Sequence, residues 1–325
     1  MPVAPSASAI VADAAERPSD RAALLIPQPS AANARFVIEY DARRWVRVIF
    51  QRRGSIAPRL LGRTLFSSLL GIAAVEVDQR MHFALSPIAH TMIGAALGLL
   101  LVFRTNASYD RYWEGRRLIG GIISRSRDLA RQLAAFLPGV ANEADRRRMR
   151  GWIESFYWLA TQTLRNETRL EAVASLSASE RESLKESGAR PYVVATWIAI
   201  ELARLTSEGK LSEQRLRSMD ANLSGLIDSL TGCERILRTP VPFAYAQHIK
   251  TFVVLFCFTA PFTMSDAMGW LTPIASGLLA FALMGIDEIG VEIEDPFGTD
   301  ANDLPLDVIG ERIGRDTREV LAARA

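Results

Sequence analysis

The sequence is poor in the residues that most catalytic and metal sites use. Its 325 residues include only two cysteines, Cys233 and Cys257, and three histidines, His82, His90 and His248. Two cysteines are too few for a disulfide scaffold or a paired-cysteine metal site, so we expect both to be small buried residues. The histidines are widely separated, and we interpret each as an interior or headgroup-level residue rather than a metal ligand.

Catalytic motifs are missing as well. No phosphate loop, glycine-rich dinucleotide turn or nucleophile elbow occurs, so we predict neither an enzyme nor a bound cofactor. Lysine is scarce, with three against 35 arginines, and 38 basic residues nearly balance 36 acidic ones. This balance excludes a strongly polyanionic chain and argues against a flexible lysine tail that binds nucleic acid. We expect no nucleic-acid partner.

Apolar and charged residues are segregated along the chain. The mean hydropathy is +0.10 although 23% of the residues are charged. Four apolar segments, at residues 60–77, 83–103, 241–264 and 270–286, are each close to the roughly 20 residues that span a bilayer as a helix. Arg63, His248 and Lys250 interrupt two of them, and isolated polar residues in such segments face the protein interior or snorkel to the surface. The pattern predicts two transmembrane hairpins in a lipid bilayer.

The arginines give the expected orientation. They cluster before the first segment, in RRWVRVIFQRRG (43–54), after the second, and before the third, whereas the two hairpin tips carry only Arg80. The positive-inside rule therefore predicts that both termini and the middle of the chain lie in the cytoplasm. We expect the chain to cross the inner membrane of the cell several times. Apolar residues three and four apart predict that this middle part is helical throughout.

An all-α membrane protein with six regions follows. Residues 1–34, rich in alanine, proline and serine and without a secretory signal, are predicted to be a disordered tail. The other expected regions are an N-terminal cytosolic or interfacial helix at 35–58, a first transmembrane hairpin at 59–103, a helical cytosolic domain at 104–239, a second hairpin at 240–290 and a C-terminal cytosolic segment at 291–325.

The second apolar segment has an unusual face. Ala95, Leu99 and Phe103 recur every four positions and share one side of a helix, while Gly94 and Gly98 form an adjacent surface for close helix contact. If copies of this helix surrounded an axis, rings of these apolar side chains would form a narrow dry throat that opposes ion passage. The alternative is that the stripe faces lipid, and periodicity alone leaves both possibilities open.

Three motifs resemble those of the bestrophin family of ion channels. They read FRTNASYDRYWEGRR (103–117), TGCERILRTPVPFAY (231–245) and EIEDPFGTDANDLPLD (292–307), and the similarity extends from about residue 35 to 315 in the same order. The resemblance implies a homopentamer with four membrane helices per subunit, a helical cytosolic body and a single axial pore. Animal members are calcium-activated anion channels, whereas bacterial members lack firm calcium control and can favour monovalent cations.

The resemblance also assigns pore residues. The hydrophobic neck falls on Ala95, Leu99 and Phe103, and because the family commonly has isoleucine at the first position, we expect a wider outermost ring. The cytosolic aperture falls on Gln214, whose amide can hydrogen-bond an ion of either sign. The alternatives here are a solvated surface glutamine, or a one-residue offset to Glu213 or Arg215.

The residues after the neck form the expected pore-mouth motif: Arg104, Asn106, Arg111, Trp113 and Glu114. We favour structural use of both arginines as donors to carbonyls at helix ends, with attraction of anions as the alternative. Trp113 suits headgroup depth as an anchor. Asp287 and Glu288, which end the fourth segment, are expected to pair with the arginines near Arg104; a cation site there is the alternative.

A helix start and an acidic turn are two further candidates for ion contacts. Pro240, Val241 and Pro242 suit a helix start, where exposed amide groups can stabilise chloride. In calcium-gated relatives an acidic run after Pro-Phe-Gly binds the metal, but here only Asp300, Asn302 and Asp303 retain oxygen ligands. We therefore expect poor calcium affinity, no confident metal site, and a helix-terminating turn that clasps neighbouring subunits.

The sequence predicts a passive channel for small inorganic ions. Chloride and other monovalent anions are favoured, because residues 104–238 carry a net charge of +5. Three alternatives are a channel of the same fold selective for Na+ or K+, a non-conducting membrane scaffold, and a soluble arginine-rich nucleic-acid binder in which the apolar segments are core helices.

Overall fold

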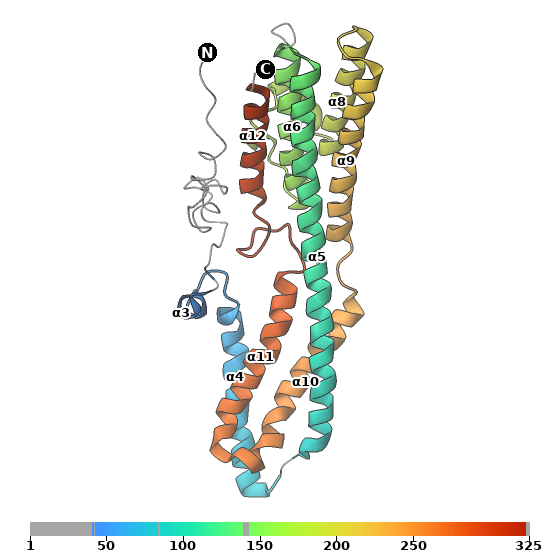
Figure 1. The fold of residues 1–325 in the computed structure, drawn as a ribbon. Coiled ribbons are helices and arrows are strands. Elements are labelled where there is room, and N and C mark those ends of the chain that lie inside the picture. Colours follow the sequence, from blue (N-terminus) through green and yellow to red (C-terminus); the bar gives the residue numbers. More distant parts are fainter. Residues whose placement is uncertain (1–40, 42, 84, 139–142, 323–325) are drawn as a thin grey trace, which may run out of the picture.

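One helix runs through the whole molecule. The computed structural model describes residues 41, 43–83, 85–138 and 143–322, and every regular element within these ranges is helical. Helix α5, Pro87–Phe136, is 50 residues long, or about 75 Å. Helices α4, α10 and α11 lie alongside its first half and form with it what is here called the apolar half, and α6, α8, α9 and α12 lie alongside its second half and form with it the distal half (Figure 1).

The continuity of α5 differs from the predicted domain boundary between residues 103 and 104. No proline lies between Pro87 and Pro138, so nothing in the backbone ends the helix at the last apolar residue. Its buried positions also continue at helical spacing through both halves, from Leu97 and Leu101 to Leu129 and Leu133. The two halves are therefore joined by a rigid rod rather than by a linker.

The apolar half consists of α4 (Ala57–Met81), the start of α5, α10 (Phe243–Met268) and α11 (Thr272–Glu292). Within the described residues, three helical stretches are long and apolar enough to cross a membrane: Ala57–Met81, Pro87–Phe136 and Phe243–Glu292. The third stretch includes both α10 and α11, joined by the 3-10 turn η4 (Gly269–Leu271), and folds back on itself as a hairpin (Figure 1).

Small residues bring α4 against α11. A Cβ added at Gly71 would lie 2.7 Å from the Cα of Pro273, so only glycine allows this approach. The Ser67 hydroxyl donates to the carbonyl of Ser276, and the Ser276 hydroxyl donates back to the carbonyl of Ser67, each at 3.1 Å. Small residues and interhelical hydrogen bonds of this kind hold helices together where apolar burial gives little preference between lipid and protein.

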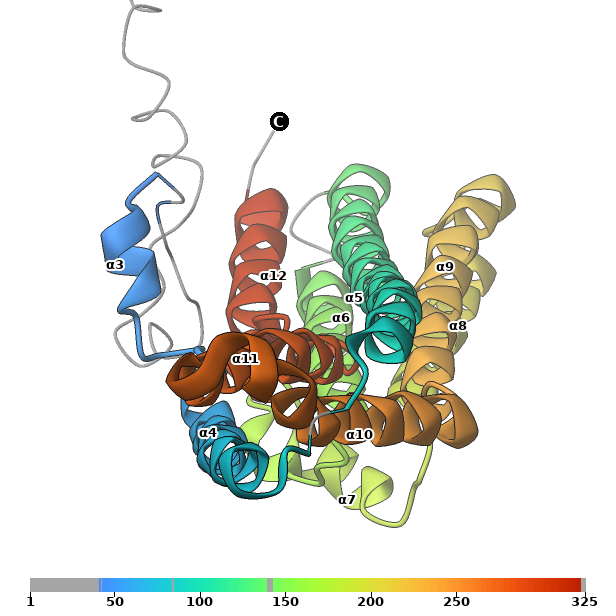
Figure 2. The same cartoon turned by 90° about the horizontal axis from the view of Figure 1, so that it is seen from below.

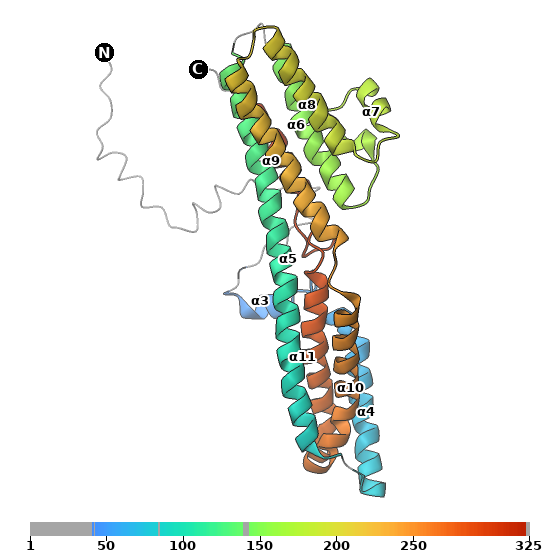
Figure 3. The same cartoon turned by 90° about the vertical axis from the view of Figure 1, so that its right-hand side faces the viewer.

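The distal half has its own hydrophobic core. It contains α6 (Glu143–Leu164), α8 (Arg190–Ser207), α9 (Glu213–Arg238) and α12 (Leu306–Ala322), and the short η3 (Leu170–Ala172) and α7 (Ala178–Leu184) project to one side (Figure 3). Tyr157 is buried in this core and donates to the carbonyl of Leu306 at 2.8 Å, which fixes α12. Cys233 lies in this core and Cys257 in that of the apolar half, so the predicted burial of both cysteines is confirmed.

The N-terminal part of the structure departs from the expected helix at 35–58. Among the residues described before Ala57, where α4 begins, the only helix is the short α3 (Trp45–Ile49). Gly54, at φ +72°, lies in the connection between them and marks a turn that a continuous helix would not permit. Residues 35–40 and the predicted tail at 1–34 lie outside the described residues.

Candidate functional site: the exposed face of α5

The predicted stripe lies on the surface of the chain. The side chains of Leu99 and Phe103 are 57% and 56% exposed and Ala95 is exposed, whereas Leu97 and Leu101, on the opposite side of α5, are buried. Helices α4, α10 and α11 all lie to one side of α5 when the bundle is viewed along its length (Figure 2). The other described helices therefore leave this face of α5 uncovered.

The two glycines of the adjacent surface have different surroundings. A Cβ at Gly94 would lie 2.8 Å from the ring of Phe256, so Gly94 allows α10 to pack closely on α5. Gly98 has no heavy atom within 4 Å of such a Cβ and faces open space. The predicted close helix contact at the glycine surface is therefore present within the chain at Gly94, while Gly98 borders the uncovered stripe.

Immediately after the stripe comes a buried ion pair. Arg104, only 2% exposed, places its Nε 3.0 Å from Oδ1 of Asp287, and the Lys250 ammonium donates to Oδ2 of the same carboxylate at 3.0 Å. Glu294 lies 3.5 Å from Arg104 and adds a second carboxylate. The predicted pairing of Asp287 with Arg104 is confirmed. Glu288, in contrast, pairs with Arg63 of α4 at 3.0 Å, which corrects its expected partner.

The side chain of Arg111 is hydrogen-bonded to backbone carbonyls. Its guanidinium donates to the carbonyls of Ile236 at 2.8 Å, Thr239 at 2.5 Å and Glu294 at 3.3 Å. The first of these carbonyls lies in the last turn of α9, where no amide of the helix is left to bond to it. Arg111 is thus a donor to carbonyls at a helix end, as predicted, whereas Arg104 differs from the prediction because its partners are carboxylates. The alternative, attraction of passing anions, would require the guanidiniums to leave these partners.

The predicted helix start after residue 240 is present, but its first amide is occupied. Helix α10 begins at Phe243 with Pro242 as its N-cap, and Pro240 and Pro242 have no N–H to offer. The backbone N–H of Val241 donates to a carboxylate oxygen of Glu294 at 3.0 Å. An internal carboxylate thus occupies the Val241 amide, one of the groups at which an anion contact was expected.

Other motif residues continue the uncovered face beyond the neck. Asn106 is exposed, Trp113 is 52% exposed, and Glu114 forms an ion pair with Arg117. Asp110 is also exposed at this helical spacing, and sequence reasoning missed it. The signal was its position seven residues after Phe103, which places both side chains on one side of α5.

Gln214 lies on the exposed first turn of α9, at the end of that helix remote from the apolar half. Ser212 caps this turn by accepting from the amide of Arg215. The guanidinium of Arg215 lies over the ring of Phe136, 5.2 Å from its centroid, and so turns toward its own chain. All three predicted positions, Glu213, Gln214 and Arg215, are exposed in the chain.

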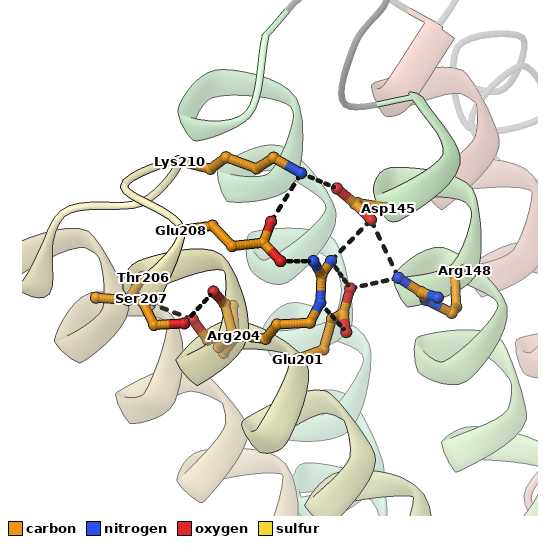
Figure 4. Close-up of polar contacts among 9 residues, drawn as sticks. Asp145, Arg148, Glu201, Arg204, Thr206, Ser207, Glu208 and Lys210 are labelled. Atoms are coloured by element: carbon orange, nitrogen blue, oxygen red, sulfur yellow. Dashed lines mark hydrogen bonds and ion pairs between the residues drawn. The ribbon is translucent and has the colours of Figure 1, made fainter.

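A cluster of charged side chains fixes the connection that leads to Gln214 (Figure 4). Asp145 of α6 accepts from Arg148 at 3.0 Å, Arg204 at 2.9 Å and Lys210 at 3.2 Å. Glu201 of α8 accepts from Arg204 at 2.6 Å and from Arg148 at 2.5 Å. The hydrogen bonds from Arg204, followed by those from Arg148, hold the pKa of Glu201 below its ordinary value.

The predicted calcium candidates form a turn. The backbone amide of Asp300 donates to Asp303 at 2.6 Å, and the Asn302 amide donates to the carbonyl of Gly54 at 3.1 Å and to Glu292 at 3.2 Å. Burial, together with neighbouring carboxylates, raises the pKa of Asp303 to about 6. Among the described residues, no group of three or more histidine, cysteine or acidic side chains is arranged to hold a metal ion.

These features define an all-helical membrane protein in which one long helix connects an apolar bundle with a polar one and leaves an apolar stripe uncovered. Residues 37–319 match the family described as bacterial and fungal bestrophin protein. The chain therefore belongs to the bestrophin family.

Relatives and solved structures agree with this membership. The chain is 39% identical over 279 residues to a voltage-dependent anion channel-forming protein of Nostoc sp., with 84% of this chain and 91% of the relative covered. It is 32% identical over 284 residues to the voltage-dependent anion channel-forming protein YneE of Escherichia coli, covering 84% and 90%. A crystal structure of a bacterial bestrophin homologue from Klebsiella pneumoniae matches with a TM-score of 0.77 at 30% identity, over 82% of this chain and all of the other.

Proposed function

We propose that this chain is the subunit of a passive anion channel, a homopentamer whose five copies of α5 surround one axial pore. Each subunit crosses the cell membrane four times, through α4, the start of α5, α10 and α11, and both termini lie in the cytoplasm. The expected neck is the stripe Ala95, Leu99 and Phe103, and the expected cytosolic exit is Gln214. The proposed channel has no enzyme activity, in keeping with relatives that are named channel-forming proteins.

The observation that carries the proposal is the uncovered stripe and its continuation. The exposed face of α5 is continuous: it runs from the apolar Leu99 and Phe103 to the polar Asn106 and Asp110 on the same side of the helix. Apolar followed by polar side chains along one rigid face suits an axis that leads from a dry constriction to a wet vestibule.

The choice of anions rests on the relatives and on the overall charge. Three relatives at 33–39% identity are named anion channel-forming proteins, and residues 104–238 carry a net +5. Arg104 and Arg111 contribute little to the selection, because their guanidiniums are held by Asp287 and by backbone carbonyls. A dry neck opposes ions of both signs, and the less strongly hydrated monovalent anions pay the smaller dehydration cost.

Reconstitution tests the proposal. The purified protein should migrate as a pentamer in detergent and should carry current in planar bilayers without an energy source. Under a KCl gradient, the sign of the reversal potential should show chloride passage. A reversal potential of the opposite sign would replace this proposal with the cation-selective alternative, and pentamers that carry no current over a range of lipids and pH would favour the scaffold.

A further inference from the structure

The segment that precedes the first membrane helix is not explained by ion conduction. It contains α3 and its flanks, residues 43–53, which we call the basic anchor. Its large apolar side chains are strongly exposed, Trp45 by 75% and Phe50 by 78%, with Val46 and Ile49 close behind. Such exposure is unusual for a segment with no function, because isolated apolar side chains are tolerated but contiguous ones mark contact surfaces.

Arginines surround these apolar side chains. Five lie within the eleven residues of the basic anchor, which contains no acidic residue; just before it, Asp41 forms an ion pair with Arg44 at a separation of 3.4 Å. Four of the arginines line the same hollow as apolar anchor residues: Arg44, Arg47, Arg52 and Arg53 with Val46, Val48 and Phe50. The surface therefore combines a net charge of one sign with exposed aromatic groups.

The basic anchor is held at the boundary of the apolar half. Helix α3 lies beside the first turn of α4, level with the end of α11 (Figure 1). The carbonyl of Gly54, between α3 and α4, accepts from the Asn302 side chain at 3.1 Å, so the turn after α11 fixes this connection. Arg59, in the first turn of α4, pairs with Glu292 at the end of α11. These contacts hold the connection that follows the basic anchor at the end of the apolar half, the level at which the proposed membrane ends.

We propose that the basic anchor binds the surface of anionic phospholipids, with Trp45, Ile49 and Phe50 inserted at the acyl boundary and the arginines on the headgroup phosphates. A short segment that combines exposed aromatic groups with arginines suits the interface between water and hydrocarbon. Charge complementarity selects the occupant. Five copies of a segment this basic would repel one another, whereas a negatively charged leaflet attracts each of them.

Insertion of Trp45 can be measured separately from conduction. Full-length protein is reconstituted in vesicles of phosphatidylglycerol brominated near the glycerol end of the acyl chains, and quenching of tryptophan fluorescence is compared between wild type and Trp45→Phe. We expect the variant to lose part of the quenching. Equal quenching would overturn the proposal, since it would mean that Trp45 is covered by protein, for example by a second copy of this chain.

Headgroup binding is tested in detergent. Native mass spectrometry follows titration of the intact protein with phosphatidylglycerol and, separately, with phosphatidylcholine. The variant Arg43→Gln, Arg44→Gln, Arg47→Gln should lose affinity for phosphatidylglycerol by roughly fivefold for each arginine removed, because each basic side chain near an anionic surface contributes about 1 kcal/mol. Affinity for phosphatidylcholine should not change.

A matched variant controls for charge alone. Replacement of three exposed arginines of the distal half, Arg131, Arg147 and Arg217, by glutamine removes the same charge far from the basic anchor. It should leave phosphatidylglycerol binding as in wild type. An equal loss of phosphatidylglycerol affinity in both triple variants would contradict a binding site at the basic anchor. The proposal rests on the membrane location of α4 and not on conduction, so lipid binding by a protein without current would separate the two.

Discussion

Arg104 on α5 and Asp287 on α11 form an ion pair inside the protein, with Nε and Oδ1 3.0 Å apart and both side chains buried. Arg104 directly follows Phe103, the innermost residue of the expected neck. The pair therefore joins the proposed pore-lining helix to the last helix of the apolar half at the level where the neck ends. Lys250 of α10 shares the same carboxylate, so three helices meet at this point.

Asp287→Asn should strongly destabilise the protein. The substitution leaves the Arg104 guanidinium buried without its nearest carboxylate, and removal of one partner of a buried pair typically costs about 3–5 kcal/mol. The midpoint of thermal unfolding in detergent should fall clearly. Arg63→Gln, which breaks the more exposed pair with Glu288, is the matched control and should cost about 1 kcal/mol or less. Equal effects of the two variants would argue against a special role for Arg104.

Ala95→Ile should reduce single-channel conductance. Isoleucine adds three carbons to each of five side chains in the outermost ring, which narrows the throat and lengthens its dry section. Ala73→Ile, at an exposed position of α4, makes the same change on a surface expected to face lipid and should leave conductance unaltered. A current that responds equally to both substitutions would show that Ala95 does not face the pore.

Gln214→Leu should make the cytosolic exit a stronger barrier. An apolar ring cannot donate to or accept from a passing ion, so the current should fall, with a larger loss for more strongly hydrated ions. Glu213→Gln tests the alternative register. If Glu213→Gln shifts the reversal potential while Gln214→Leu leaves the current unchanged, the aperture lies one residue earlier than we infer.

Acid should weaken the charged cluster before α9. The pKa of Glu201 is held below its ordinary value by Arg204 and then Arg148, so its stabilising contribution is present above the unfolded-state pKa of about 4.5 and is lost as the pH falls through the folded-state value. The difference in unfolding midpoint between wild type and Glu201→Gln should therefore be largest near pH 7 and shrink below pH 4.5. A difference that grows with acidity would contradict this assignment.

Local patterns in the sequence predicted the helical class and the positions of the apolar segments. Hydropathy placed the first segment at 60–77, inside α4, and located the helix that begins after Pro242. The family resemblance, rather than periodicity, chose between pore and lipid for the stripe at Ala95, Leu99 and Phe103. That orientation still depends on neighbouring copies, which a single chain does not contain.

Contacts between residues far apart in the sequence could be predicted only in part. A count of apolar residues ended the second segment at Phe103 because arginine is costly in a membrane helix, yet Arg104 is neutralised by a carboxylate 183 residues further along the chain. The three carbonyl partners of Arg111 and the amide of Val241 that Glu294 occupies are likewise set by the meeting of α5, α9 and α11. No local pattern specifies such partners.

Access of water to Leu99 tests the central claim most directly. In Leu99→Cys, a membrane-impermeant charged thiosulfonate reagent should react with the new thiol and block or markedly change the current, since the side chain faces the pore. The native Cys233 and Cys257 are buried, so wild type should not respond, and Leu69→Cys, at a similarly exposed position of α4, should also be unaffected. An unmodified Leu99→Cys with unchanged current would show that the stripe faces lipid and would contradict the account.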